Sequence, residues 1–251
     1  DGEEVETRHH SPKPLEAKLA LTVEGAAKTI RASNLVGVLP ASPGAAPTEE
    51  IIVLGAHLDH VGMGGAISMS KEDAMHPGAD DNASGVAGVL EVAEALAATP
   101  GRTRDVYVVA FDAEEPGLYG SSALVEVLAR EGTPTPVFML NMDMLGRPER
   151  AEVRVDGVYS GHGLAESVRR AQTGLVVHPL LVRGAPVGSD HLSFLQQKIP
   201  VLSLHTGQHD DYHTPRDTAD QIDIAGLKQV VTLGFRLARD VVRRQRRVVW
   251  R

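Results

Sequence analysis

Short apolar runs, each bounded by turn-forming or polar residues, recur along the chain. Residues 51–56 (IIVLGA) are continuously apolar rather than alternating, which is typical of a strand buried on both faces of a sheet. Similar runs follow at residues 106–111, 137–142, 153–158, 176–182 and 201–204. The pattern therefore predicts a sheet whose central strands have no solvent-facing side.

Helical periodicity fills the intervals between these runs. Residues 84–97 place Val86, Val89, Leu90, Ala93 and Ala97 on one predicted helical face, with glutamates pointing away. Further helices are expected at 121–130, 162–172, 191–197 and from about Asp223 onward. Strands that alternate with helices indicate an α/β fold with a mostly parallel sheet covered on both faces. No internal repeat is visible, so one domain is favoured.

The two ends of the chain differ from this pattern. Residues 1–14 are polar and rich in proline, so we expect a flexible lead-in, with the domain occupying residues 15–251. Residues 15–23 and 29–39 resemble a hairpin that adds antiparallel strands at one edge of the sheet. The basic run at 243–247 (RRQRR) is interpreted as the solvated end of the last helix.

Composition narrows the class of partner. Lys and Arg number 25 against 33 Asp and Glu, and the net charge of −8 argues against nucleic acid. No cysteine is present, which excludes disulfides and thiolate metal sites. No apolar run of about 18 residues exists, so no membrane span is expected. Because the chain begins at Asp1 without a basic-then-apolar leader, we expect that a signal peptide or a preceding domain has been removed.

Five histidines and carboxylates occupy strand ends or short loops where metal ligands would be expected. They are His57, Asp81, Glu115, Asp143 and His213. Strand ends of a parallel sheet bring distant residues to one edge, and nitrogen and carboxylate ligands without cysteine suit catalytic zinc. Taken singly, each has a plain structural explanation: a strand-end histidine, a helix-capping aspartate or a surface carboxylate.

Neighbouring residues suggest a division of roles. Asp59 follows His57 by two positions, so in an extended segment its carboxylate can orient the imidazole. Glu114 and Glu115 point in different directions in an extended stretch, so one can bind metal while the other faces a reacting water. His205 and His209 remain alternatives to His213, whereas the other histidines, including His60, lack a comparable carboxylate context.

Six motifs in order extend the argument from single residues to a family. The segments GAHLD, GADDNASG, DAEEPGLYGS, NMDMLG, GSDHLSF and YHTPRDT resemble the co-catalytic dizinc aminopeptidase family. This clan of zinc exopeptidases comprises secreted bacterial leucyl aminopeptidases, glutamate carboxypeptidases and glutaminyl cyclases. The match runs from about residue 34 to residue 224, which is most of the chain.

The resemblance implies a three-layer α/β/α sandwich around a mixed sheet of about eight strands. It implies two Zn²⁺ ions per chain, bridged by Asp81, with His57 and Asp143 completing one site and Glu115 and His213 the other. Glu114 would be the general base, Asp59 the partner of His57, and Tyr212 a group that polarises the scissile carbonyl. The Asp81–Asn82 peptide would be cis. The implied substrates are peptides with a free N-terminus, and the habit of the relatives implies a secreted or periplasmic location.

Three alternatives within this fold stay open. A carboxypeptidase would need a cationic pocket, for which Arg147 and Arg183 are the candidates. A glutaminyl cyclase generally works with one zinc, and a receptor-like homologue usually loses ligands or the base.

The insert at 61–77 is longer than in the smallest relatives and is expected to border the substrate pocket. Related chains with this form often carry an additional protease-associated domain, which we expect to have preceded Asp1.

Overall fold

The computed structural model describes residues 31–46, 48–183 and 188–251, and every feature below lies in the compact unit Ala32–Arg251. Within these residues, seven strands form one mixed sheet in the order β1-β3-β2-β4-β7-β5-β6. The strands are β1 (Leu35–Leu39), β2 (Glu50–His57), β3 (Asp105–Phe111), β4 (Thr135–Met142), β5 (Glu152–Asp156), β6 (His178–Leu181) and β7 (Val201–His205). The predicted mixed, mostly parallel α/β sheet is confirmed.

The four central strands β3, β2, β4 and β7 run parallel, so their carboxyl ends meet at one edge of the sheet. Antiparallel pairs occur where β1 joins β3 and where β5 joins β7. The first strand of the predicted hairpin, at 15–23, and the predicted boundary at residue 14 lie outside the described residues. The second predicted strand is observed as β1, at the antiparallel edge of the sheet.

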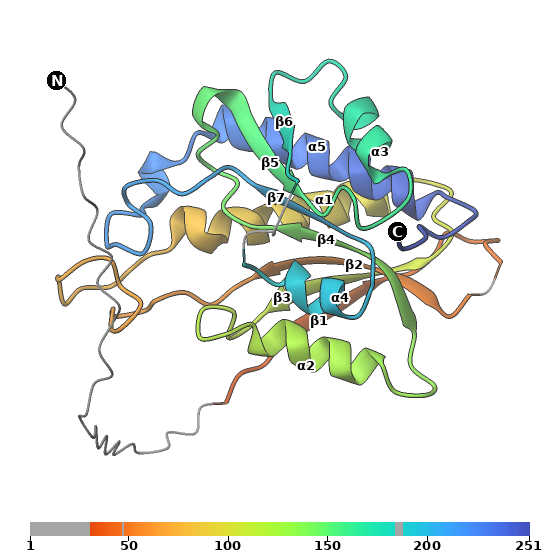
Figure 1. The fold of residues 1–251 in the computed structure, drawn as a ribbon, viewed down its shortest axis with the longest axis horizontal. Helices are drawn as coiled ribbons and strands as arrows, with labels where there is room; N and C mark the ends of the chain where they lie inside the picture. The colour runs from red at the N-terminus through yellow and green to blue at the C-terminus, as the bar shows by residue number, and fades with distance from the viewer. Residues whose placement is uncertain (1–30, 47, 184–187) are drawn as a thin grey trace, which may run out of the picture. The chain divides into compact units, whose positions relative to one another are not determined.

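Helices cover both faces of the sheet and give three layers (Figure 1). Helices α1 (Gly85–Ala97), α3 (Leu164–Ala171) and α5 (Ile224–Val242) pack on one face, and α2 (Tyr119–Leu128) and α4 (His191–Gln196) on the other. Short helical turns lie at Ala79–Ser84, Glu149–Ala151 and Ala219–Gln221. Two apolar cores result, and Ile52, Leu54 and Leu140 point into the larger one while Val53 and Met139 point into the smaller. Among the described residues, no helix is long and apolar enough to cross a membrane.

The buried face of α1 differs from the predicted one. Leu90 is 61% exposed, whereas Gly85, Gly88, Val92 and Leu96 are buried. The glycines let the helix lie close to other segments of the same chain. A Cβ at Gly88, for example, would lie 3.0 Å from a side-chain atom of Leu145. The predicted face, which included Leu90 and left out the glycines, is therefore rotated relative to the observed one.

Helix α5 begins at a capping residue and ends before the basic run. Asp223 caps the helix by accepting a hydrogen bond from the Gly226 amide, as preferred N-cap residues do. The helix ends at Val242, so the basic run 243–247 lies beyond its last turn rather than within it. Arg244 still reaches back to the Asp240 carboxylate at 2.6 Å.

Candidate metal centre

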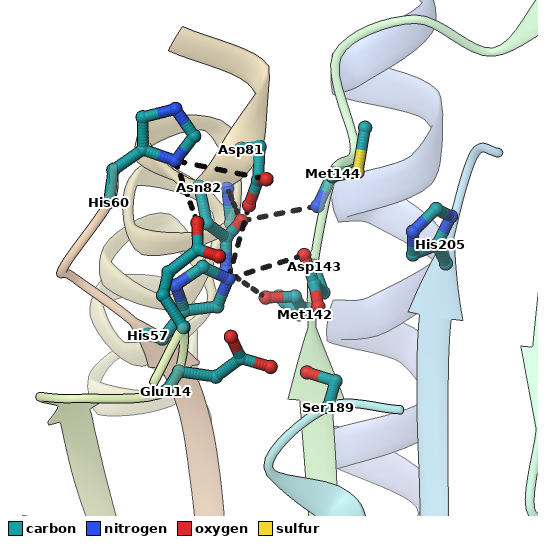
Figure 2. A network of polar contacts seen from close by, with 12 residues as sticks. His57, His60, Asp81, Asn82, Glu114, Met142, Asp143, Met144, Ser189 and His205 are labelled. Atoms are coloured by element: carbon teal, nitrogen blue, oxygen red, sulfur yellow. Dashed lines mark hydrogen bonds and ion pairs between the residues drawn. The ribbon is translucent and has the colours of Figure 1, made fainter. Parts of the chain in front are cut away.

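The five predicted ligands converge at the carboxyl edge of the parallel strands, as Figure 2 shows for three of them. His57 is the last residue of β2, and Asp143 directly follows β4. Glu115 lies in the turn between β3 and α2, and His213 lies in the loop between β7 and α5. Asp81 sits in the helical turn before α1, so five separate segments contribute.

Asp81 is the centre of the cluster because its two oxygens face different partners. Oδ1 lies 3.3 Å from Nε2 of His57, and Oδ2 lies 3.1 Å from Nε2 of His213. Asp143 Oδ1 joins the first side at 3.5 Å from the same His57 nitrogen. Glu115 Oε2 joins the second side at 3.0 Å from His213. Two groups of possible metal-binding atoms thus share one carboxylate.

The outward nitrogens of both imidazoles contact backbone carbonyls. His57 Nδ1 lies 3.1 Å from the Asp59 carbonyl oxygen, and His213 Nδ1 lies 2.8 Å from that of Ile67. A carbonyl oxygen can only accept, so Nδ1 carries the hydrogen in both rings and Nε2 faces the carboxylates. Such outer contacts fix the tautomer of metal-binding histidines.

Asp59 plays a different part from the predicted one. Its backbone carbonyl, rather than its carboxylate, accepts the hydrogen bond from His57, and the carboxylate lies 3.7 Å from that nitrogen. The carboxylate instead accepts hydrogen bonds from the amides of Glu114 at 2.9 Å and Glu115 at 3.2 Å. Asp59 therefore holds the turn that carries both glutamates.

Burial dominates the acidity of Glu114. Desolvation raises the pKa of this carboxyl to about 8. The charge of His57 opposes this rise, and the neighbouring carboxylates of Asp143 and Asp190 add to it. A carboxyl whose pKa lies near neutrality is suited to exchange protons during a reaction.

The cluster concentrates negative charge that needs a cationic partner. Although burial opposes ionisation of Asp81, contacts with His213 and His57 lower its pKa. Although burial also opposes a charged imidazole, the carboxylates of Asp81 and Glu115 raise the pKa of His213 to about 10. The Nε2 atom of His213 is buried and makes no well-aligned hydrogen bond despite these short distances. The donor set of imidazole nitrogens and carboxylates therefore fits divalent zinc.

The side chain of Asn82 helps to hold the cluster in place, a role that the sequence did not reveal. The amide of Asn82 connects two ligand-bearing segments, since Nδ2 donates to the Met142 carbonyl at 3.1 Å and Oδ1 accepts from the Met144 amide at 3.2 Å. The peptide between Asp81 and Asn82 is cis, as the resemblance implied. Positive φ angles at Ala113, Met144 and His213 mark three of the site segments, a conformation uncommon outside glycine.

A buried ion network connects three of the ligand-bearing segments. Asp217 is fully buried and accepts hydrogen bonds from the amides of Asp80 and Asp81, each at 3.0 Å. Arg147 donates to Asp217 at 3.1 Å and to Asp211 at 2.8 Å. Arg147 follows Asp143 by four positions, and Asp211 precedes His213 by two. In the sequence, Arg147 directly follows the segment NMDMLG, Asp211 directly precedes YHTPRDT, and Asp217 lies within YHTPRDT.

The alternatives to His213 lie elsewhere. His209 Nε2 is 3.2 Å from the Asp80 carboxylate, and His205 Nδ1 accepts from the Gly207 amide. His60, by contrast, enters the cluster, with Nδ1 2.9 Å from Glu115 Oε1. In the sequence, His60 is the second histidine of the segment HLDH (57–60), and this position close to His57 could have pointed to it. Tyr212 stacks on His213 with ring centroids 3.8 Å apart.

The insert 61–77 is attached to the cluster through the backbone of His213. Met69 donates its amide hydrogen to the His213 carbonyl at 2.9 Å, next to the contact made by the Ile67 carbonyl. Segment 67–69 of the insert therefore lies beside the candidate metal cluster, and a border with the substrate pocket stays a prediction.

Comparisons with known proteins agree with this geometry. The family model described as Peptidase family M28 matches residues 34–237. The chain is 30% identical over 212 residues to YfbL of Escherichia coli, covering 72% of this chain, and 28% identical over 224 residues to aminopeptidase YwaD of Bacillus subtilis, covering 85%. It spans 64% and 46% of the lengths of these two relatives. The crystal structure of BSAP, a zinc aminopeptidase from Bacillus subtilis, superposes with a TM-score of 0.70 at 27% identity, covering 85% of this chain and 51% of that one.

Proposed function

Because the chain belongs to peptidase family M28, we propose that it is a zinc-dependent aminopeptidase that binds two zinc ions and removes N-terminal residues from peptides. The observation that carries this proposal is the position of Asp81, whose two oxygens face two separate groups of ligand atoms. His57 and Asp143 would hold one ion, and Glu115 and His213 the other, with Asp81 shared between them. The named activities of YwaD and BSAP support the same reaction class.

Zinc bound at this cluster would supply the Lewis acidity that activates a water and polarises a substrate carbonyl. Glu114 then acts as the base that takes a proton from the attacking water and returns it to the leaving amine. In the metal-free site, burial raises the pKa of Glu114 to about 8, so this carboxyl is able to hold a proton near neutral pH.

Two further residues support this assignment. Burial and the surrounding carboxylates raise the pKa of Tyr212, so its phenol keeps a proton that can be donated to the developing oxyanion. Asp59 fixes the Glu114 amide and so sets the position of the base.

The two arginines considered for a carboxypeptidase pocket are both engaged. Arg147 forms ion pairs with Asp211 and Asp217 at 2.8 and 3.1 Å. Arg183 donates to the Tyr159 hydroxyl at 2.9 Å and lies over its ring. Arg147 is thus held by two carboxylates and Arg183 by Tyr159, an arrangement that favours the aminopeptidase over the carboxypeptidase.

A panel of aminoacyl-p-nitroanilides, assayed beside the same compounds N-acetylated, tests the proposal. We expect cleavage of the free-amine substrates only, loss of cleavage with a chelator and recovery with added zinc. Cleavage of acetylated or C-terminal substrates instead would refute aminopeptidase activity. Protein that binds no zinc after reconstitution would refute the metal assignment itself.

A further inference from the structure

His60 is an additional buried imidazole in the cluster to which the family motif gave no role. It lies in the loop after β2, and its side chain is 9% exposed. Nδ1 is 2.9 Å from Glu115 Oε1 and 3.8 Å from Asp81 Oδ2, two carboxylates already placed among the ligands. Figure 2 shows the ring directed toward Asp81.

The position of Nδ1 is compatible with binding the same ion as its neighbours. Single ligand atoms of His60, Asp81, Glu115 and His213 all lie within 4.8 Å of one another. Atoms that share a zinc at about 2.0–2.2 Å lie no more than about 4.4 Å apart, and both distances from Nδ1 satisfy this limit. His60 also meets the His213 ring edge-on, with centroids 5.4 Å apart, so the two imidazoles approach the carboxylates from different directions.

The remaining atoms of the ring are consistent with this role. His57 and His213 each hold their proton on Nδ1 through a backbone carbonyl. In His60 no such carbonyl contacts Nδ1, and Nε2 is buried without a partner among the described residues. With its proton on Nδ1, the ring donates a hydrogen bond to Glu115 at 2.9 Å; with the proton on Nε2, the Nδ1 lone pair faces the Glu115 and Asp81 carboxylates, and a cation between them would then be bound by all three groups.

The two groups of ligand atoms are unequal in number. The group around His57 has three members, His57, Asp81 and Asp143, whereas the group around His213 has four once His60 is counted. Zinc sites with four protein ligands are typically closed, and catalytic zinc sites keep one position open for water or substrate. Figure 2 shows the Glu114 side chain beside His57, and the charges of His57 and Asp143 act on Glu114 more strongly than that of Glu115, so the proposed base lies nearer the three-membered group.

Resting on the proposed dizinc function, we propose that His60 is a fourth protein ligand of the Glu115–His213 site, bound through Nδ1. This site is then closed and holds its ion tightly, while the His57–Asp143 site keeps the open position beside Glu114. The two ions therefore differ in role: one organises the bridging Asp81, and the other takes part in the reaction.

Metal binding rather than activity tests this inference. Zinc stoichiometry and the two affinities are measured by competition with a chromophoric chelator, for the wild type, His60→Ala and His60→Asn. Asparagine keeps a hydrogen-bond donor near the position of Nδ1 but removes the imidazole lone pair. His178→Ala is the control, because His178 is an exposed histidine at the start of β6 and belongs to neither group of ligand atoms.

We expect two zinc ions in the wild type, and a loss of affinity of at least about tenfold for one of them in both His60 variants. The affinity for the other ion is unchanged in these variants, and the His178→Ala variant binds both ions with wild-type affinity. Visible absorption of the cobalt-substituted proteins provides a second readout, since replacing an imidazole ligand changes the spectrum of one site only.

Three outcomes separate the possible failures. If His60→Asn binds both ions as the wild type does, His60 only donates a hydrogen bond to Glu115, and the inference is wrong. Unchanged affinities in folded His60→Ala also overturn it, and both results leave the proposed function intact. A wild type that binds no zinc removes the proposed function itself. If His60→Ala does not fold, as judged by circular dichroism, the larger and polar His60→Asn variant decides the question.

Discussion

Replacing Arg147 by methionine should destabilise the protein far more than replacing Arg216, although both arginines pair with Asp211. The Arg147 side chain is 13% exposed and also contacts Asp217, which is fully buried. The Arg216 side chain is 57% exposed and contacts Asp211 at 2.8 Å. The pair of variants therefore compares a buried cation with a surface one against the same carboxylate.

The expected magnitude follows from the charge left behind. Removing one partner of a buried ion pair costs roughly 3–5 kcal/mol, because the other charge stays buried and uncompensated. Asp217 keeps its hydrogen bonds from the amides of Asp80 and Asp81, so the lower end applies, about 3 kcal/mol. For a chain of this length, that corresponds to a fall in melting temperature of roughly 6–12 °C. Arg216→Met should cost about 0–1 kcal/mol, as exposed pairs do.

Chemical denaturation of the metal-free proteins, followed by circular dichroism, measures both free energies of unfolding. A zinc titration then measures the affinity of both variants for zinc. This affinity should be lower in Arg147→Met if the ion pairs of Arg147 with Asp211 and Asp217 hold the ligand-bearing segments in place. Equal losses of stability for the two variants would refute the argument that burial of Asp217 sets the energy. The loss of stability in Arg147→Lys should lie between those of Arg147→Met and Arg216→Met, because an ammonium keeps the charge but cannot bond both carboxylates as the planar guanidinium does.

Three further predictions concern the base, a buried carboxyl and the packing of the ligand turn. Glu114→Gln should keep zinc but lower kcat by roughly 10²–10⁴-fold, measured on the best p-nitroanilide substrate; near-normal turnover would remove Glu114 from its role. Burial raises the pKa of Asp190 to about 7 from its ordinary 3.8, so its contribution to stability is present below about pH 4 and is lost as pH rises through about 7. In metal-free protein, the free energy of unfolding of Asp190→Asn should therefore fall less between about pH 4 and pH 7 than that of the wild type. Equal pH dependence in the two proteins would contradict the raised pKa of Asp190. Gly85→Ala should cost roughly 1–3 kcal/mol, because a Cβ there overlaps the Asn82 side chain and the Met142 carbonyl. In contrast, Gly37→Ala should be nearly neutral in the same unfolding assay, its nearest neighbour being the Val108 carbonyl oxygen at 3.8 Å.

Local sequence was sufficient for the central strands because each is a continuous apolar run that only a doubly covered sheet can bury. Residues 51–56 illustrate this, since they lie within β2 and are all buried. The helix at 84–97 was located correctly but rotated about its axis. Its orientation depends on how closely Gly85 and Gly88 let neighbouring segments approach, and glycine carries no signal in an apolar count.

The candidate ligands were also predictable, because histidines and carboxylates at the ends of apolar strands are costly unless something pairs with them. Their convergence follows from the parallel direction of β2, β3 and β4, which the alternation of strands and helices indicated. What each side chain contacts was not predictable. Asp59 was expected to use its carboxylate on His57, yet it uses its carbonyl there and its carboxylate on the amides of Glu114 and Glu115.

The sequence by itself thus determined the α/β class, the order of the strands along the chain and the kinds of ligand available, since these depend on periodicity and residue type. Tertiary structure alone decided which groups meet. Asp217 lies 136 positions from Asp81, and Arg147 lies 70 positions from Asp217, so no local pattern relates them. His60 joins Glu115 across 55 positions for the same reason. Contacts between distant segments depend on the register and packing of the folded chain, which bring their side chains within hydrogen-bonding distance.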